Sequence, residues 1–228
     1  MAEKTLNHFA FFRFTQEFWA QDGGARERLL REWQESLRGA AECAHLYQVS
    51  PLRADVDVLV WSALPAEKDE DGGRFFQNFA RQMNARRRWM EISSVLWGFT
   101  KPSQYARGAS SQEIEPLVPE RKPYLVVYPF VKTVEWYLLS RDTRQGMMNQ
   151  HIRIGHQYPE IKQLLLYSFG LQDQEFVVVY EMDSLTQFSD LVNELRGSEA
   201  RRYTERDTPN FSAIWRSPQD LIDLYAAE

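Results

Sequence analysis

Two hydrophobic patterns alternate along the first hundred residues. Short aromatic and β-branched runs are typical of strands, and stretches with apolar residues three or four apart are typical of helices. Leu30, Trp33 and Leu37 show the helical spacing. The acidic, glycine-containing residues 69–73 indicate a loop. The pattern predicts strands at 7–14, 45–49, 56–64 and 90–99 and helices at 25–41 and 75–87.

The same order of elements recurs in the last hundred residues. Phe188, Leu191 and Leu195 again follow the helical spacing. The pattern predicts strands at 124–132, 161–168, 175–182 and 210–215, helices at 141–158 and 186–195, and a short terminal helix at 218–226. The stretch between the two repeats is rich in proline, glycine and serine and has no clear period, which indicates a linker.

Two successive βαββαβ units predict a duplicated ferredoxin-like fold of the α+β class. We expect the two sheets to pack face to face as a dimeric α+β barrel and to bury the aromatic strands between them. The expected domains are residues 1–100 as the scaffold half, which would also make oligomer contacts, 101–122 as the linker, and 123–228 as the half that carries the site.

Composition narrows the class of protein. The 228 residues include 27 Lys and Arg against 32 Asp and Glu, a net charge of −5, so sequence-independent nucleic-acid binding is not expected. The single cysteine, Cys43, excludes an intrachain disulfide framework and a cysteine-rich zinc site. No apolar run approaches the roughly 18 residues of a membrane span. No secretory leader is evident either, so we expect a cytoplasmic protein.

His151 is the first candidate for chemistry. Met147, His151, Ile154 and Tyr158 fall three or four apart, so they share one helix face that points inward, while most other positions are polar. Two interpretations stay open: a core histidine satisfied by a hydrogen bond, or a metal ligand. A single inward histidine without partners favours haem over zinc, because a porphyrin supplies four ligands itself.

The sequence resembles a known family at four segments of its second half. These are YPFVKTVEWYLL (128–139), MMNQHIRIGHQYP (147–159), IKQLLLYSFGLQD (161–173) and ELRGSEARRY (194–203). They resemble the chlorite dismutase superfamily, and within it most closely the coproheme decarboxylases. The resemblance spans nearly the whole chain and implies two ferredoxin-like halves, an iron porphyrin in the C-terminal half, and assembly as a homopentamer.

On the iron side, the resemblance implies three roles. His151 matches the axial iron ligand, and Glu199 matches the acidic residue that hydrogen-bonds the other nitrogen of that histidine and increases its electron donation. Gln163 matches the distal position, where chlorite dismutases carry an arginine.

On the porphyrin edge, the resemblance makes Tyr128 the reactive tyrosine and Lys132 the basic residue beside the propionate that is removed. Arg196 matches a propionate-binding arginine, and Trp136 matches an aromatic residue beside the haem. Positions 128 and 132 have the same parity on a strand and lie roughly 13 Å apart, the scale of a porphyrin edge. Taken alone, Tyr128 could be an ordinary core tyrosine, and Lys132 and Gln163 could face solvent.

The implied activity is peroxide-dependent oxidative decarboxylation of iron coproporphyrin III (coproheme) to haem b through a tyrosyl radical. Coproheme would be both cofactor and substrate, hydrogen peroxide the oxidant, and the upstream ferrochelatase a transient partner. The chain departs from the pattern at His156, where some relatives carry arginine, and at Arg201, where others carry a propionate-binding serine. Residues 101–123 also lack the histidine that one branch uses on the distal side.

Two other functions stay open. A chlorite dismutase would split chlorite into chloride and O2, but a neutral Gln163 would hold an anionic intermediate poorly compared with an arginine. A non-catalytic haem carrier would bind haem without turnover, and Tyr128 argues against it.

Overall fold

The structure is a computed structural model that describes residues 4–105 and 110–227. Residues 106–109 of the expected linker lie outside the described residues. The first half contains β1 (Thr5–Phe14), α1 (Gln16–Trp19), α2 (Gly23–Arg38), β2 (Cys43–Gln48), β3 (Val58–Pro65), α3 (Asp69–Asn84) and β4 (Met90–Thr100). All four predicted strands and both predicted helices are present, and α1 is an addition.

The second half repeats the order with further short elements. It contains β5 (Tyr124–Lys132), α4 (Val134–Leu138), α5 (Arg141–Gly155), β6 (Lys162–Tyr167), β7 (Phe176–Met182), α6 (Leu185–Arg196), the 3-10 helix η1 (Glu199–Tyr203), β8 (Thr204–Arg206), β9 (Phe211–Arg216) and α7 (Pro218–Ala226). The predicted strands and helices are again present. The sequence pattern did not predict α4, η1 and β8, which are five residues long or shorter.

The start of α3 corrects one expectation. Residues 69–73, predicted as a loop, form the first turn of this helix. The Asp71 carboxylate accepts a hydrogen bond from the Lys68 backbone N–H at 2.9 Å. Acidic side chains also complement the positive end of the helix dipole. These two effects outweigh the low helix propensity of Gly72 and Gly73.

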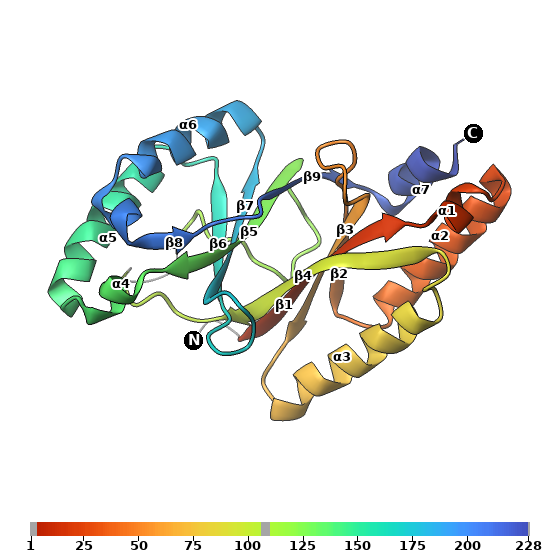
Figure 1. Ribbon diagram of the computed structural model, residues 1–228, viewed down its shortest axis with the longest axis horizontal. Coiled ribbons are helices and arrows are strands. Elements are labelled where there is room, and N and C mark those ends of the chain that lie inside the picture. Colours follow the sequence, from red (N-terminus) through yellow and green to blue (C-terminus); the bar gives the residue numbers. More distant parts are fainter. Residues whose placement is uncertain (1–3, 106–109, 228) are drawn as a thin grey trace.

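The strands of both halves join in one sheet that closes on itself. Its order is β7-β6-β4-β1-β3-β2-β9-β5-β8, and a further pairing of β5 with β7 closes the barrel. The halves meet at β4–β6 and β2–β9. In Figure 1, α4, α5 and α6 lie at one end of the molecule, and α1, α2, α3 and α7 lie at the other, with the strands between them.

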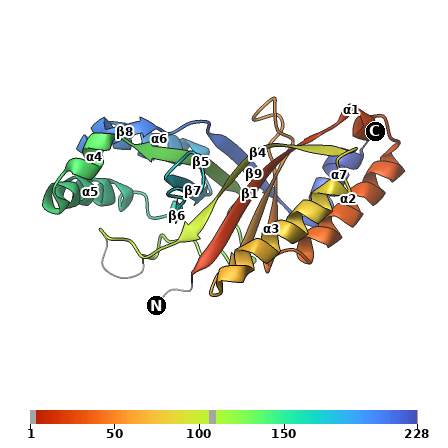
Figure 2. The ribbon, with the colours of Figure 1, turned by 60° about the horizontal axis from the view of Figure 1, so that its bottom comes forward.

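The predicted core of aromatic strands lies inside this barrel. Side chains of both halves meet there, among them Phe9, Phe11 and Trp61 from the first half and Val127 and Phe211 from the second. The rings of Phe11 and Phe211 stack with their centres 3.8 Å apart. Two further clusters lie outside the barrel, one beneath α2, α3 and α7 and one beneath α5 and α6. Figure 2 shows these helices on the outside of the strands.

The C-terminal helix packs on the opposite half of the chain. Leu221 and Ile222 of α7 are buried in the cluster of the N-terminal strands, and the Tyr225 hydroxyl donates a hydrogen bond to the Asp57 carbonyl at 2.7 Å. Arg26 of α2 donates to the Ala227 carbonyl at 2.6 Å. The outer face of the C-terminal strands is therefore left to α4, α5, α6 and η1.

Candidate haem site

The outer face of β5, β6 and β7 is only partly covered by helices. Its residues follow from the strand register, which aligns Val126 with Tyr180 and Gln163, Tyr128 with Val178 and Leu165, and Phe130 with Phe176 and Tyr167. Val126 and Tyr180 are buried against α5 and α6, but Leu165 is 42% exposed. Phe130, Tyr167 and Phe176 of the same face are also partly exposed.

His151 lies on the helix that faces this surface. Ser140 caps α5 by accepting a hydrogen bond from the Thr143 N–H, and none of Arg141–Gly155 is fully buried. Ile154 packs against the strands, and His151 lies one turn earlier on the same helix face. Burial, and then the positive charge of Lys132, lower the pKa of His151 to about 4. Its imidazole is therefore neutral near pH 7 and can donate a lone pair to a metal.

The Glu199 side chain is 61% exposed. Its carboxylate lies 3.4 Å from Nη1 of Arg202 on the surface, and its backbone N–H donates to Oε1 of Gln150 at 3.2 Å. None of the hydrogen bonds or ion pairs recorded within 4–105 and 110–227 joins Glu199 to His151. A role for Glu199 at the imidazole therefore requires its side chain to turn inward.

Tyr128 lies in the middle of β5 beside a second tyrosine. Its ring is nearly parallel to that of Tyr180, with the two centres 6.3 Å apart. Burial raises the pKa of Tyr128 well above its ordinary value, and the neighbouring Tyr180, with which it shares a hydrogen bond, adds to the rise. The phenol is therefore protonated at any physiological pH, so its oxidation must release a proton together with the electron.

Lys132 is the last residue of β5, and its ammonium is partly buried. Its Nζ donates to the Ala200 carbonyl at 3.2 Å and lies 4.3 Å from the centre of the Trp136 ring. Burial, followed by the charge of Arg201, lowers the pKa of Lys132 to about 8, against an opposing effect of Glu175. None of the ion pairs of the described residues includes Lys132. A partly buried ammonium without an ion pair can bind a carboxylate.

Trp136 is an aromatic residue that lies beside the Lys132 ammonium. It is 3% exposed, and its ring centre lies 5.8 Å from that of Tyr203 and 6.4 Å from that of Tyr105. It belongs to α4, the short helix that follows β5 directly.

Gln163 lies on the outer face at the start of β6, with its side chain exposed. Its backbone is held at both polar groups: the N–H donates to the Gln112 carbonyl at 2.7 Å, and the carbonyl accepts from the Ile114 N–H at 3.0 Å. The segment after the undescribed residues 106–109 thus fixes this end of β6. The side chain that it presents is a neutral amide.

Arg196 is joined to a residue that sequence analysis missed. Nη1 of Arg196 lies 2.6 Å from Oδ2 of Asp207, and Nη1 of Arg201 lies 2.7 Å from the same oxygen. The charges of Asp207 and Arg196 both affect the pKa of Tyr128, so this cluster borders the same site. No local pattern identifies Asp207, because its partners come from two other elements.

Three further residues were also missed. Tyr180 has the parity on β7 that faces Tyr128, so strand alternation could have found it. The Glu175 carboxylate accepts hydrogen bonds from the Tyr137 hydroxyl at 2.5 Å and from the Lys132 backbone N–H at 2.9 Å. These contacts depend on tertiary structure and leave no sequence signal.

The residues present fit an iron porphyrin. An apolar strand face stands open opposite a helix that buries none of its own residues and carries a neutral histidine. Positive side chains border that face at Lys132, Arg196 and Arg201. Within the described residues, no group of three or more His, Cys, Asp or Glu could hold a metal ion. An ion at His151 would thus need ligands from elsewhere, which a porphyrin supplies.

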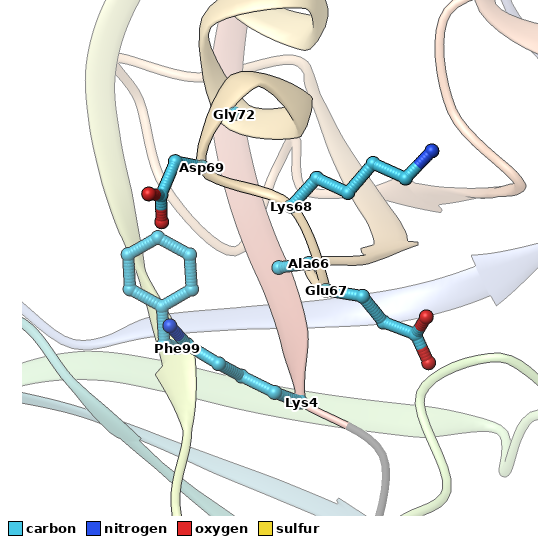
Figure 3. Close-up of a pocket in the computed structure, with 7 residues that line it drawn as sticks. All are labelled: Lys4, Ala66, Glu67, Lys68, Asp69, Gly72 and Phe99. Atoms are coloured by element: carbon cyan, nitrogen blue, oxygen red, sulfur yellow. The ribbon is translucent and has the colours of Figure 1, made fainter.

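A separate hollow lies in the N-terminal half. Figure 3 shows it between the start of α3 and the end of β4. Its volume is about 290 Å³. Its lining residues are Lys4, Ala66, Glu67, Lys68, Asp69, Gly72 and Phe99. Lys4 lies over the Phe99 ring at 4.7 Å from its centre. None of the predicted site residues lines this hollow.

Comparisons with known proteins agree with this architecture. The sequence model described as Chlorite dismutase matches residues 26–215, so the chain belongs to the chlorite dismutase family. Among curated relatives, the coproheme decarboxylase of Mycolicibacterium smegmatis is 30% identical over 182 residues, which cover 78% of this chain and 74% of the relative.

Solved structures from the same family share the fold. A variant of the chlorite dismutase from Candidatus Nitrospira defluvii superposes with a TM-score of 0.84 at 22% identity, over 99% of this chain and 97% of the other. The enzyme from the same organism in complex with imidazole gives a TM-score of 0.83 at 20% identity, over 99% and 97%. At these identities the likeness establishes the fold. Among the described residues, no helix has the length and apolar character needed to cross a membrane.

Proposed function

We propose that this chain is a haem-iron oxidoreductase that converts iron coproporphyrin III to haem b with hydrogen peroxide. The observation that carries the proposal is the partly buried ammonium of Lys132, which forms no ion pair within the described residues and which acts electrostatically on His151. A carboxylate-bearing ligand that also offers a metal to His151 accounts for both features. The 30% identity to a coproheme decarboxylase supports the same conclusion.

The chemistry balances for each propionate removed. A side chain –CH2–CH2–COO⁻, one H2O2 and one proton yield –CH=CH2, CO2 and two H2O. The propionate loses two electrons, and the peroxide gains them. The C–C bond to the carboxylate breaks, a hydrogen leaves the carbon attached to the ring, and a vinyl group forms. Two such rounds convert the substrate to haem b.

The chain's own residues would divide this work. His151 would hold the iron through its neutral imidazole. Tyr128, once oxidised to a tyrosyl radical, would take the hydrogen atom from the propionate and return to its protonated form. Lys132 would orient the carboxylate until CO2 departs, and its pKa of about 8 lets it exchange a proton near neutrality. The substrate's iron supplies the peroxide chemistry.

The remaining expected residues would shape the site. Trp136 would border the porphyrin edge next to Lys132, and Arg196 would bind a propionate. Gln163 would face the open side of the iron as a neutral amide, which disfavours an anionic oxychlorine intermediate. Glu199 would support the imidazole only after its side chain moves from Arg202 towards His151.

The test is reconstitution of purified apoprotein with iron coproporphyrin III, followed by stepwise addition of hydrogen peroxide and mass spectrometry of the extracted porphyrin. The expected result is successive loss of two carboxyl groups, through a monovinyl species, to haem b. Bound coproheme that is unchanged or bleached would refute the proposal. Oxygen release from chlorite would then indicate a dismutase, and tight binding without either turnover would indicate a carrier.

We also propose that the enzyme acts in the cytoplasm as a homopentamer and receives its substrate from the ferrochelatase that inserts iron. Support for assembly comes from α4, where Val134 and Leu138 are 68% and 80% exposed in the single chain. Light scattering on the purified protein should give five times the chain mass. A monomer at micromolar concentration would contradict this part of the proposal.

A further inference from the structure

Asp207 holds two arginines on a single carboxylate oxygen. Nη1 of Arg196 and Nη1 of Arg201 lie 2.6 Å and 2.7 Å from Oδ2 of Asp207. The Asp207 side chain is 15% exposed, whereas those of Arg196 and Arg201 are 41% and 36% exposed. The anion thus lies beneath two guanidinium groups that reach the solvent, and each guanidinium has further N–H donors free of this oxygen.

The two arginines come from different elements and need the anion to remain together. Arg196 is the last residue of α6, Arg201 belongs to η1, and Asp207 follows β8. Two guanidinium groups beside the same oxygen repel each other. The shared carboxylate offsets this repulsion by accepting two charge-assisted hydrogen bonds. The group of three keeps a net charge of +1, so it can still bind an anion.

This group borders the candidate site. β8 pairs with the end of β5, where Thr204 lies opposite Lys132. The Lys132 ammonium donates to the carbonyl of Ala200, the residue directly before Arg201. The charges of this group also act on the site. Besides the effect of burial, Arg201 lowers the pKa of Lys132. Asp207 raises the pKa of Tyr128, and Arg196 lowers it.

We propose that Asp207 is a positioning residue that fixes Arg196 and Arg201 as one paired binding site for a carboxylate. Arg201 thereby becomes a second carboxylate-binding arginine beside Arg196. The pair binds a carboxylate other than the one that meets Lys132. The proposal rests on the proposed function, since the carboxylate is a propionate of iron coproporphyrin III. The planar fork of a guanidinium matches a carboxylate, and two forks held side by side restrict its orientation.

Asp207→Asn separates positioning from a simple field effect. The substitution removes a negative charge near an anion site, so the electric field alone would strengthen binding of the negatively charged substrate. Loss of positioning would weaken it instead, by about tenfold, the worth of one charge-assisted hydrogen bond. The matched control is Glu205→Gln, which removes a negative charge from the exposed neighbouring position on β8. Asp207→Glu should restore part of the affinity.

The measurement is the dissociation constant of iron coproporphyrin III, from absorbance titration of apoprotein at two salt concentrations, with thermal unfolding as the check on folding. Asp207→Asn and Arg201→Gln should each weaken binding, and the double variant should bind no more weakly than either one. Equal or tighter binding by Asp207→Asn, or additive losses in the double variant, would overturn the proposal.

If Asp207→Asn fails to fold, Arg201→Gln and Asp207→Glu carry the same test, because Arg201→Gln must lose affinity and Asp207→Glu must retain part of it. The proposed function is tested separately by peroxide turnover of the wild type. A wild type that binds coproheme without decarboxylating it would refute the function, while the affinities would still decide the role of Asp207. A wild type that does not bind coproheme would overturn both.

Discussion

The ammonium nitrogen of Lys132 lies 4.3 Å from the centre of the Trp136 ring. The negative face of the indole compensates for part of the hydration that the cation loses on burial. Compensation is incomplete, because burial still lowers the pKa of Lys132 to about 8. The Lys132 ammonium therefore loses its proton near pH 8 unless a carboxylate binds beside it.

Removal of this cation should change how substrate binding depends on pH. In the wild type, affinity for iron coproporphyrin III should fall as the pH rises above about 8, because the Lys132 ammonium loses its charge. Lys132→Met should bind more weakly at pH 7 and should lack this fall. Titrations between pH 6.5 and 9.5 test the point. A parallel fall in both proteins would assign the pH dependence to another group.

The same pKa makes a prediction for stability. The folded-state pKa of Lys132 lies below the ordinary value of 10.5, so between pH 8 and 10.5 the unfolded chain binds a proton that the native state has released. Stability from this residue therefore rises with pH through that window. Urea denaturation should show the rise in the difference between the wild type and Lys132→Met. A constant difference across the window would contradict the lowered pKa.

Tyr128→Phe should separate binding from turnover. The variant loses one hydroxyl and keeps the ring that stacks on Tyr180, so coproheme affinity should change by less than about threefold. Decarboxylation should fall at least a hundredfold, because phenylalanine cannot provide the radical. Stopped-flow addition of peroxide to both proteins provides the measurement. Tyr180→Phe is the matched control, since it removes a hydroxyl from the diagonal position on the neighbouring strand β7. Full turnover by Tyr128→Phe would remove Tyr128 from the mechanism.

The sequence predicted the regular elements well, because period-2 and period-3.6 patterns are local. Strands such as β1, with one exposed residue among Thr5–Phe14, stand out by composition. A barrel was expected from the two repeated units, but the strand pairs that join the halves could not be predicted, because the β4–β6 junction pairs Phe99 with Tyr167 across a long separation in sequence. The start of α3 was missed because the capping contribution of Asp71 outweighs the glycine content.

The candidate site shows the same division between local and tertiary information. Tyr128, Lys132 and His151 belong to motifs, and strand or helix periodicity orients their side chains. Asp207 could not be predicted from the sequence, because its partners come from α6 and η1. The Glu199 carboxylate lies beside Arg202, a surface placement that a motif match does not reveal.

Gly98 lies at the junction of the two halves, where there is no room for a side chain. A Cβ atom there would lie 2.7 Å from Oγ of Ser168 and 2.8 Å from the carbonyl oxygen of Tyr167. Gly98→Ala should therefore lower the free energy of unfolding by about 1–3 kcal/mol. Gly73→Ala is the matched control, because no atom lies within 4 Å of its Cβ position and it belongs to α3. Alanine there should stabilise by roughly 0.5–1 kcal/mol. Thermal and urea unfolding measure both variants. Equal changes in stability for Gly98→Ala and Gly73→Ala would contradict the close approach at Gly98.

His8 should limit stability in acid. It is 3% exposed on β1, and its ring lies 4.7 Å from that of Phe79 and 5.2 Å from that of Phe75, measured between centres. Burial lowers the pKa of His8 to about 3, whereas the ordinary value is 6.5. Between these values the unfolded chain takes up a proton that the native state refuses, so native stability falls as the pH decreases from 6.5 towards 3.

The contribution of His8 can be isolated with His8→Leu. One proton corresponds to a slope of about 1.4 kcal/mol per pH unit, and the variant should lose that part of the acid dependence. Leu6→Val, in the same buried cluster, is the control, because it lowers stability without removing a titrating group. Urea denaturation of the three proteins at pH 7, 6, 5 and 4 gives the slopes. A parallel loss of stability in His8→Leu and the wild type would contradict the prediction. It would mean that the His8 ring is protonated in the native state, with β1 opened to water around it.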